Sequence, residues 1–324
     1  MPEIYATLGP RCSDAETLAA MFDVGMTGVR LNLSHITLHD AAAEIEIFHH
    51  AAQKCGVKAQ LLIDMQGPEL RIGTLEQPVT LRPGDTVRLG AGGIPVPEII
   101  LPALQKRQSV LLDDGKILLE LLNRFEARVI HGGSLQSRKS LSLPGHSFPT
   151  PAVTGQDYVN LSIARDYGVT GVMQPFVRSR SDLAEVREVL NQHGGQDIRL
   201  LAKVESREGV EKLDELIPAC DEIVIARGDL GNAMPLWELP RVQKQISAKC
   251  RAQGRPFMVV TQMLYSMERS PVPTRAEVSD IFNAVCDGAA SVMVTGETAV
   301  GDYPVEAIRY LTNTAHEALQ YLQI

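Results

Sequence analysis

Short apolar segments alternate with longer segments of helical periodicity along most of this chain. Three apolar segments precede residue 70 (IYATLGP, GVRLNLS and AQLLIDMQGPE), and five follow residue 150 (GVMQPFV, IRLLAKVES, EIVIARGDLG, FMVVTQML and SVMVTGET). Strands that alternate with helices pair in parallel through right-handed crossovers, and eight such units close naturally into a barrel. The pattern therefore predicts an α/β fold, a (β/α)8 TIM barrel, with an open doubly wound sheet as the alternative.

The last helical segment indicates which helix face meets the barrel. Its apolar residues recur at the spacing of a single face. We expect that face to pack on the strands, and its members are Ile308, Leu311, Ala315, Ala318 and Leu322.

Residues 72–150 interrupt the rhythm and predict a small inserted β domain after the third strand. Short apolar runs in this stretch are separated by the sequences PGD, DDG and HGG, which favour tight turns between strands. We predict a barrel domain of residues 1–71 and 151–324 and a β-barrel-like lid domain of residues 72–150.

Composition narrows the range of partners. The formal net charge of −8, without a long run of Lys or Arg, provides no basic field for a nucleic acid. The five cysteines include no C-x-x-C pair, which is typical of reduced thiols. The N-terminus lacks the pattern of a signal peptide, and every apolar stretch falls short of about 18 residues. We expect a cytoplasmic protein with no nucleic-acid or membrane partner.

The second predicted strand carries polar residues on one face. Arg30, Asn32 and Ser34 alternate with Leu31 and Leu33, and side chains two apart on a strand point to the same side. An arginine that points into a barrel needs an anion or a carboxylate to offset its burial. We therefore predict an anion site; a polar-facing strand of an ordinary sheet is the alternative.

Two later strand ends carry candidate metal ligands. Lys203 and Glu205 lie two apart near the end of the fifth strand, where a structural salt bridge is the alternative interpretation. Asp229 follows the sixth strand. Two carboxylates on neighbouring strand ends suit an octahedral Mg²⁺ whose other ligands are substrate oxygens and water.

The end of the sixth strand, IARGDLG, has a second feature. As an extended segment it would place Arg227 and Asp229 on one face, while Gly228 and Gly231 would let backbone N–H groups turn toward a ligand. A simple turn is the alternative.

Three more polar residues fall at the ends of predicted strands, which is the catalytic rim of such a barrel. Asp64 ends the third strand, Thr261 the seventh and Glu297 the eighth. For Thr261 the alternative is an ordinary β-branched strand residue, and for Glu297 it is a helix cap.

Long motifs spread over nearly the whole chain resemble those of the pyruvate kinase family. They are TLGPRCSDAETL, GVRLNLSH, LLIDMQGPELRIG, DDGKILL, AKVESREGV, ARGDLG, TQMLYSM, PTRAEVSDIFNAVCDGA and TGETAVGDYPVEA. The resemblance implies a phosphotransferase that converts phosphoenolpyruvate and ADP to pyruvate and ATP.

The same resemblance implies two kinds of cation. Glu205 and Asp229 would bind Mg²⁺ or Mn²⁺, and Glu69 matches the acidic residue of K⁺-dependent members, so we expect K⁺ activation. The implied K⁺ ligands are Asn32, Ser34, Asp64 and the carbonyl of Met65.

Roles toward the substrate follow by resemblance as well. Lys203 would stabilise the transferring phosphoryl group and the enolate, the N–H groups of Gly228 and Asp229 would hold the substrate carboxylate, and Thr261 would help to deliver a proton. The implied catalytic residues are Lys203, Thr261, Arg30 and Arg71, with Arg30 also in contact with substrate. The implied nucleotide-binding residues are His35, Arg71 and Lys139, of which Lys139 has a solvated surface charge as its alternative.

Several positions depart from the family pattern. Met65 and Gln66 stand where Thr-Lys is usual, and Pro175 replaces a Ser near the metal site. The other departures are Ser142 for Asn, Tyr265 for Glu and Val300 for Lys. They lie mostly on the phosphoryl and nucleotide side. Two alternatives therefore stay open: a lyase or other transferase that uses a metal-bound pyruvate enolate, and a non-catalytic binding protein.

The sequence also stops at the end of the eighth helix, without the family's C-terminal regulatory domain. We do not expect allosteric sugar-phosphate control, and homo-oligomerisation is left open.

Overall fold

The computed structural model describes residues 1–146 and 148–323, which divide into two compact units. The barrel unit consists of Met1–Gly67, Ala152–Arg227 and Pro240–Ile324. The insert unit consists of Pro68–Pro151 and Gly228–Leu239. Each unit is described by itself.

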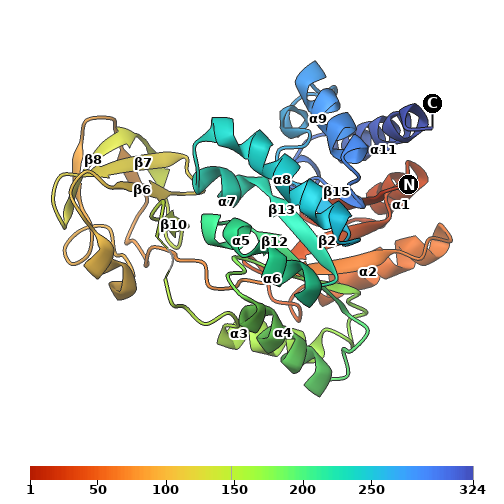
Figure 1. Ribbon diagram of the computed structural model, residues 1–324, viewed down its shortest axis with the longest axis horizontal. Coiled ribbons are helices and arrows are strands. Elements are labelled where there is room, and N and C mark those ends of the chain that lie inside the picture. Colours follow the sequence, from red (N-terminus) through yellow and green to blue (C-terminus); the bar gives the residue numbers. More distant parts are fainter. Residues whose placement is uncertain (147, 324) are drawn as a thin grey trace. The chain divides into compact units, whose positions relative to one another are not determined.

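Eight parallel strands of the described chain close into a barrel in the order β1-β15-β14-β13-β12-β11-β3-β2, with helices around them (Figure 1). The predicted (β/α)8 barrel is thereby confirmed. Its strands are β1 (Glu3–Thr7), β2 (Gly28–Asn32), β3 (Gln60–Asp64), β11 (Gly171–Gln174), β12 (Arg199–Val204), β13 (Glu222–Ala226), β14 (Phe257–Val260) and β15 (Ser291–Met293).

Most of the longer helices are preceded by a residue whose side chain caps the first turn. Asp14, Thr154, Ser179 and Thr274 each accept a backbone N–H from that turn. The helices of the barrel unit are α1 (Ala15–Asp23), α2 (Ala42–Lys54), α3 (Gly155–Ile163), α4 (Arg180–Gln192), α5 (Arg207–Glu211), α6 (Leu213–Leu216), α8 (Leu239–Ala252), α9 (Arg275–Cys286), α10 (Gly296–Ala299) and α11 (Pro304–Tyr321). Short 3₁₀ turns are η2 (Ile217–Ala219) and η4 (Tyr265–Glu268), and α7 (Arg227–Asn232) with η3 (Leu236–Glu238) follows β13.

The buried face of α11 agrees with the sequence pattern except at its end. Ile308, Leu311, Ala315 and Ala318 are fully buried. The prediction for Leu322 is wrong, because α11 ends at Tyr321 and the Leu322 side chain is 53% exposed.

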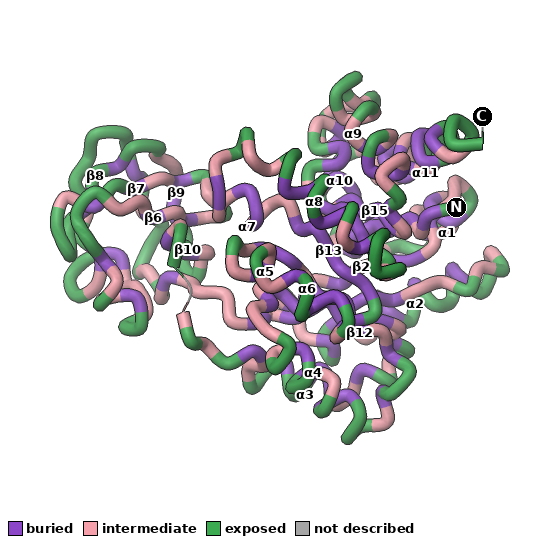
Figure 2. The backbone as a smooth tube through the Cα atoms, viewed as in Figure 1, coloured by how far each residue is buried: buried purple, intermediate pink, exposed green. Residues whose placement is uncertain are grey.

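The interior of the barrel is apolar in the middle and charged at both ends. Because strand side chains alternate, residues two apart on β12 share the interior: Arg199 lies at the N-terminal end, Leu201 in the middle and Lys203 near the C-terminal end. In Figure 2 the backbone of the barrel strands is coloured mostly as buried. The apolar layer separates two polar clusters and includes Tyr5, Leu62, Met173, Leu201, Val224, Met258 and Met293.

The insert unit is antiparallel β-structure, as the turn sequences predicted. One sheet has the strand order β10-β6-β7-β8-β5, and β4 pairs with β9. Its elements are β4 (Val79–Leu81), β5 (Thr86–Arg88), η1 (Glu98–Ala103), β6 (Ser109–Leu112), β7 (Ile117–Leu121), β8 (Glu126–His131), β9 (Gly133–Leu135) and β10 (Leu141–Ser142). Its core includes the fully buried Leu89, Ile100, Val110, Leu112, Leu119, Leu121 and Val129.

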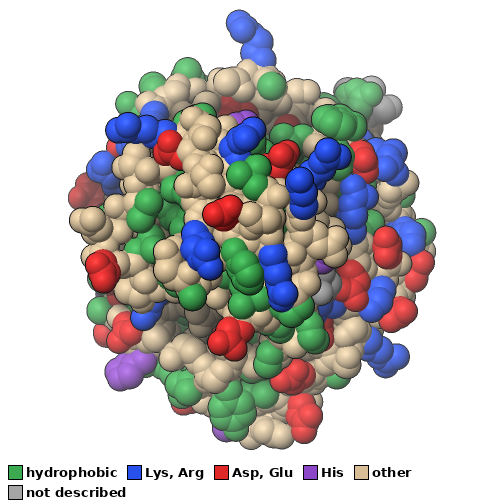
Figure 3. All heavy atoms as spheres, turned by 90° about the vertical axis from the view of Figure 1, so that its left-hand side faces the viewer, with side chains coloured by type: hydrophobic (Ala, Val, Ile, Leu, Met, Phe, Trp, Pro, Cys, Tyr) green, Lys and Arg blue, Asp and Glu red, His purple; other side chains and the backbone are tan. Residues whose placement is uncertain are grey.

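Two surface properties bear on partners. On the face drawn in Figure 3, acidic and basic side chains are interspersed with apolar ones. Among the described residues, no helix has the length and apolar character needed to cross a membrane.

Gly28 is a test of how tightly the barrel strands pack. A Cβ atom there would lie 2.4 Å from the Gln60 carbonyl oxygen and 2.8 Å from the Tyr5 ring. We expect Gly28→Ala to lower the free energy of unfolding by about 2 kcal/mol, since strand backbone would have to shift. The measurement is chemical denaturation.

The matched control is Gly155→Ala, at an exposed position where an added Cβ meets nothing within 4 Å. This variant should be as stable as the parent or slightly more so. Equal midpoints for both variants would contradict the packing argument.

Candidate active site

The carboxylate of Asp64 is held between two cations at the C-terminal end of the barrel. Asp64 ends β3 and is 2% exposed. Its Oδ2 accepts hydrogen bonds from Arg30 Nε (2.9 Å) and Nη2 (2.6 Å). Lys203 Nζ lies 3.1 Å from both carboxylate oxygens. Strands β2, β3 and β12 thus bring three sequence-predicted residues together.

The charges of this cluster stabilise one another. Burial alone would raise the pKa of Asp64, but the charges of Lys203 and Arg30 hold it below its usual range. Burial disfavours the ammonium of Lys203, yet the carboxylates of Asp64 and Glu205 hold the pKa of Lys203 above its ordinary value. Lys203 is therefore a fixed positive charge rather than a proton donor near neutral pH.

Glu205 extends the cluster beyond the end of β12. Its Oε1 lies 2.9 Å from Lys203 Nζ, so the salt bridge considered from the sequence is present. Its Oε2 accepts the backbone N–H of Phe176 at 2.8 Å. Phe176 has a φ of +50°, a strained conformation for a non-glycine residue. The Glu205 side chain is 1% exposed.

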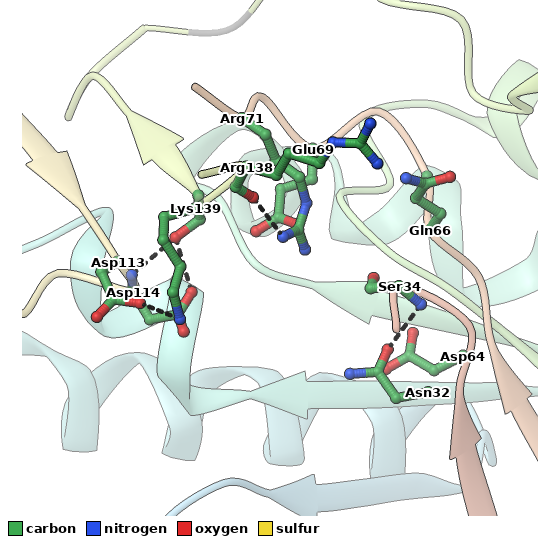
Figure 4. Close-up of polar contacts among 12 residues, drawn as sticks. Asn32, Ser34, Asp64, Gln66, Glu69, Arg71, Asp113, Asp114, Arg138 and Lys139 are labelled. Atoms are coloured by element: carbon green, nitrogen blue, oxygen red, sulfur yellow. Dashed lines mark hydrogen bonds and ion pairs between the residues drawn. The ribbon is translucent and has the colours of Figure 1, made fainter. Parts of the chain in front are cut away.

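Oxygen donors lie beside Asp64 on the neighbouring strand. Asn32 pairs with Asp64 in the β2–β3 register, and its Oδ1 accepts the N–H of Ser34 at 3.2 Å (Figure 4). Ser34 lies in the turn after β2, and Met65 follows β3, where its N–H donates to the Met173 carbonyl (3.1 Å). Amide, hydroxyl, carboxylate and carbonyl oxygens are the donor types that suit a hard monovalent cation.

The segment after β13 differs from the prediction in one respect. The expectation that Arg227 and Asp229 share a face is wrong, because the strand ends at Ala226 and helix α7 begins at Arg227. Residues two apart on a helix point in very different directions. Gly228 and Asp229 lie in the first turn of α7, where backbone N–H groups are not used by the helix itself.

Arg227 turns instead toward the end of β14. Its Nε and Nη2 donate to the Thr261 carbonyl at 3.2 and 2.8 Å, and its Nη1 donates to Asp280 at 2.6 Å. Thr261 and Gln262 have φ values of +80° and +55°. A β-branched residue rarely adopts such a φ, so these contacts hold a strained backbone at the rim. No pattern in the sequence indicates this support.

Glu297 supports loops rather than facing a ligand. Its carboxylate is 1% exposed and accepts the N–H groups of Leu264 (3.0 Å) and Thr295 (2.7 Å). The Thr295 contact lies at the start of α10 rather than of the last helix, and the Leu264 contact joins the segment after β14, so a cap on the last helix does not account for them.

The residues implied for the nucleotide lie mostly in the insert unit. Arg71 pairs with Glu69 and donates to the Arg138 carbonyl at 2.9 Å. Lys139 lies 2.8 Å from Asp113 (Figure 4). Lys139 is thus engaged in an ion pair within its own unit.

His35 belongs to the barrel unit, in the turn after β2, where its N–H donates to the Asn32 carbonyl at 3.3 Å.

The described residues contain no group of three or more His, Cys, Asp or Glu side chains placed to hold a metal. Proteins often bind Mg²⁺ through one or two carboxylates, while water and substrate phosphates complete the shell. Glu205 and Asp229 supply the oxygen ligands that such an ion prefers. Their assignment as its ligands stays a prediction.

Comparison with known proteins gives one consistent result. The family model "Pyruvate kinase, barrel domain" matches residues 2–308. Curated relatives named pyruvate kinase include one from Bacillus licheniformis, 35% identical over 99% of this chain and 58% of its own length. Others come from Methylorubrum extorquens (39% identical, 97% of this chain, 68% of the relative) and Chlamydia muridarum (36%, 97% and 68%). The chain spans 58% of the length of the Bacillus relative.

Proposed function

The chain belongs to the pyruvate kinase family, and from this premise we propose that it transfers the phosphoryl group of phosphoenolpyruvate to ADP. One observation carries the proposal: Lys203 and Arg30 converge on Asp64 at the C-terminal mouth of the barrel, and Lys203 also contacts Glu205. Active sites of this fold lie at that mouth. Two permanent cations fixed there suit a substrate with phosphate and carboxylate groups.

The chain's own residues would act chiefly by position and charge. Lys203 would lie against the transferring phosphoryl group and the enol oxygen, where negative charge grows as the bond to phosphorus breaks. Its stem is buried and its ammonium is held by two carboxylates, so it would need little rearrangement during the reaction. Arg30 would bind a phosphate oxygen from the same side.

Proton delivery would complete the conversion of the enolate to pyruvate. Thr261 is held in a left-handed conformation by the two hydrogen bonds that Arg227 donates to its carbonyl. This support would fix the hydroxyl with respect to the enolate carbon. The N–H groups of Gly228 and Asp229, in the first turn of α7, would hold the substrate carboxylate.

Two cations fit the donor set. Glu205 and Asp229 would hold Mg²⁺ or Mn²⁺, which neutralises charge on the phosphoryl oxygens and the enolate. Asn32, Ser34, Asp64 and the Met65 carbonyl would hold K⁺. On the nucleotide side, His35, Arg71 and Lys139 would contact the phosphates of ADP. Lys139 would first have to exchange Asp113 for phosphate.

A coupled assay tests this proposal. Purified chain is supplied with phosphoenolpyruvate and ADP, with Mg²⁺ and K⁺ present, and pyruvate formation is followed. We expect turnover that a chelator abolishes and added Mg²⁺ restores. No pyruvate at millimolar substrate would refute phosphotransfer to ADP by this chain.

Deuterium exchange separates the two halves of the reaction. Lys203 and Glu205, which would act on the enolate, match the family pattern, whereas departures from that pattern, such as Met65 and Gln66, lie on the phosphoryl side. Exchange of pyruvate methyl hydrogens without ADP turnover would favour a lyase or another transferase that uses the enolate. Metal-dependent binding of oxalate with neither activity would favour a binding protein.

A further inference from the structure

A fully buried carboxylate lies where the chain leaves and re-enters the barrel unit. The chain leaves this unit after Gly67 and returns at Ala152. Asp157, the third residue of α3, is 0% exposed. Its Oδ1 accepts the N–H of Gln66 at 2.9 Å, and its Oδ2 accepts the N–H of Gly67 at 3.0 Å. Oδ2 also accepts the Thr154 N–H (3.1 Å) and hydroxyl (2.7 Å).

Helix capping explains only half of these contacts. Thr154 and Asp157 form a capping box, in which each side chain bonds the other's backbone N–H. A capping box needs no contact with residues 66 and 67, some ninety positions earlier in the chain. The Asp157 carboxylate therefore joins the last two residues before the insert to the first helix after it.

Residues 65–67 also contact the end of β11. Gly67 has a φ of +61°, and a Cβ atom there would lie 2.3 Å from Cγ of Pro175. The N–H of Met65 donates to the Met173 carbonyl at 3.1 Å. Residues 65–67, directly after Asp64, thus contact both Asp157 and the end of β11.

We propose that Asp157 is a positioning residue. It joins the segment where the chain leaves the barrel unit to the helix where the chain returns, and through the N–H groups of Gln66 and Gly67 it holds the Met65 carbonyl in position. The part concerning the cation rests on the proposed function, in which that carbonyl binds K⁺. The structural part does not.

Hydrogen exchange of the full chain tests the structural part. Asp157→Asn keeps the shape but places an NH₂ group among N–H donors. We expect the amides of Gln66 and Gly67 to exchange about tenfold faster or more, since a hydrogen bond to a carboxylate contributes roughly that factor. Thr154→Val is the matched control, because it removes the cap but leaves the Gln66 and Gly67 bonds in place.

Kinetics test the positioning role. With Asp157→Asn we expect the K⁺ concentration for half-maximal activity to rise about tenfold, while kcat at saturating K⁺ stays within about threefold of the parent. A loss of folded protein alone would lower kcat and leave the K⁺ dependence unchanged. Thr154→Val should keep the parental K⁺ dependence.

Two outcomes would overturn the inference. One is equal exchange at Gln66 and Gly67 in the Asp157→Asn and Thr154→Val variants. The other needs no variant: these two amides exchange in the parent as fast as an unprotected peptide. A parent without turnover would refute the proposed function instead, and the exchange rates would still decide the role of Asp157.

Discussion

Replacement of Lys203 by Met is expected to lower kcat by about three orders of magnitude, with a small change in KM for phosphoenolpyruvate. The physical reason is that Lys203 is a fixed cation: two buried carboxylates hold the pKa of its ammonium above the ordinary value. Methionine matches the length of the stem but offers no charge to the transferring phosphoryl group. The coupled assay with Mg²⁺ and K⁺ measures the effect.

The control for this substitution is Lys244→Met on α8. Lys244 also pairs with a carboxylate, that of Asp287 at 2.7 Å, but its side chain is 56% exposed. An exposed pair of this kind contributes little to stability. Parental kinetics for Lys244→Met and a large loss for Lys203→Met would attribute the effect to the site.

Stability must be measured alongside activity, because Lys203→Met leaves Glu205 without its lysine and Asp64 with Arg30 alone. Loss of one partner from a buried ion pair costs about 3–5 kcal/mol. Circular dichroism at the assay temperature would show whether the variant is folded. A folded variant with more than a tenth of parental kcat would contradict the role proposed for Lys203.

The sequence predicted well those features that depend on local periodicity. Alternation of polar and apolar residues along β2 and β12 places Arg30 and Lys203 inside the barrel. The position of Asp64 at the end of the third apolar segment places it at the end of a strand. The antiparallel nature of the insert followed from its turn sequences. These signals require only neighbours in the chain.

The sequence could not predict contacts that depend on where distant segments end. The helix at Arg227 begins one residue after the strand, which sends Arg227 to the Thr261 carbonyl instead of sharing a face with Asp229. Residues 228–239 group with the insert, which the strand–helix rhythm does not indicate. Such partners are chosen by tertiary packing, which overrides local pattern.

A second polar cluster, at the N-terminal end of the barrel interior, was also not predicted. Glu222 is 2% exposed and accepts the hydroxyl of Ser291. Arg199 lies 3.6 Å from Glu222 and 3.3 Å from Glu3, so one guanidinium serves two carboxylates. Tyr5 joins the cluster by accepting from Arg199 (2.7 Å) and donating to Glu3 (2.5 Å). Residues at this end of a TIM barrel usually contribute to stability rather than to catalysis.

This cluster predicts how stability depends on pH. Burial raises the pKa of Glu222 from 4.5 to about 7; the Ser291 hydroxyl and Arg199 only partly oppose that rise, and the charge of Glu3 adds to it. Between pH 4.5 and about 7, the folded state therefore binds a proton at Glu222 that the unfolded state has released. Stability from this group is fully present below pH 4.5 and is lost as the pH rises through about 7.

Glu222→Gln is accordingly expected to remove this pH dependence. The shift in pKa corresponds to about 3 kcal/mol between the two limits of pH, because one pKa unit is worth about 1.4 kcal/mol. The variant cannot ionise at this position, so its stability relative to the parent should rise by up to that amount from pH 4.5 to above pH 7. Urea denaturation of both proteins across this range gives the difference directly.

The difference between the two curves is the decisive quantity, since titrating groups far from Glu222 contribute equally to both proteins. Glu46→Gln, at an exposed position on α2, controls for the loss of a surface charge and should run parallel to the parent. If the Glu222→Gln curve also runs parallel, Glu222 is ionised in the folded protein and Arg199 neutralises both carboxylates. If it diverges as expected, Glu222 keeps its proton in the folded protein until the pH approaches about 7, because a single guanidinium cannot compensate for the burial of a second carboxylate.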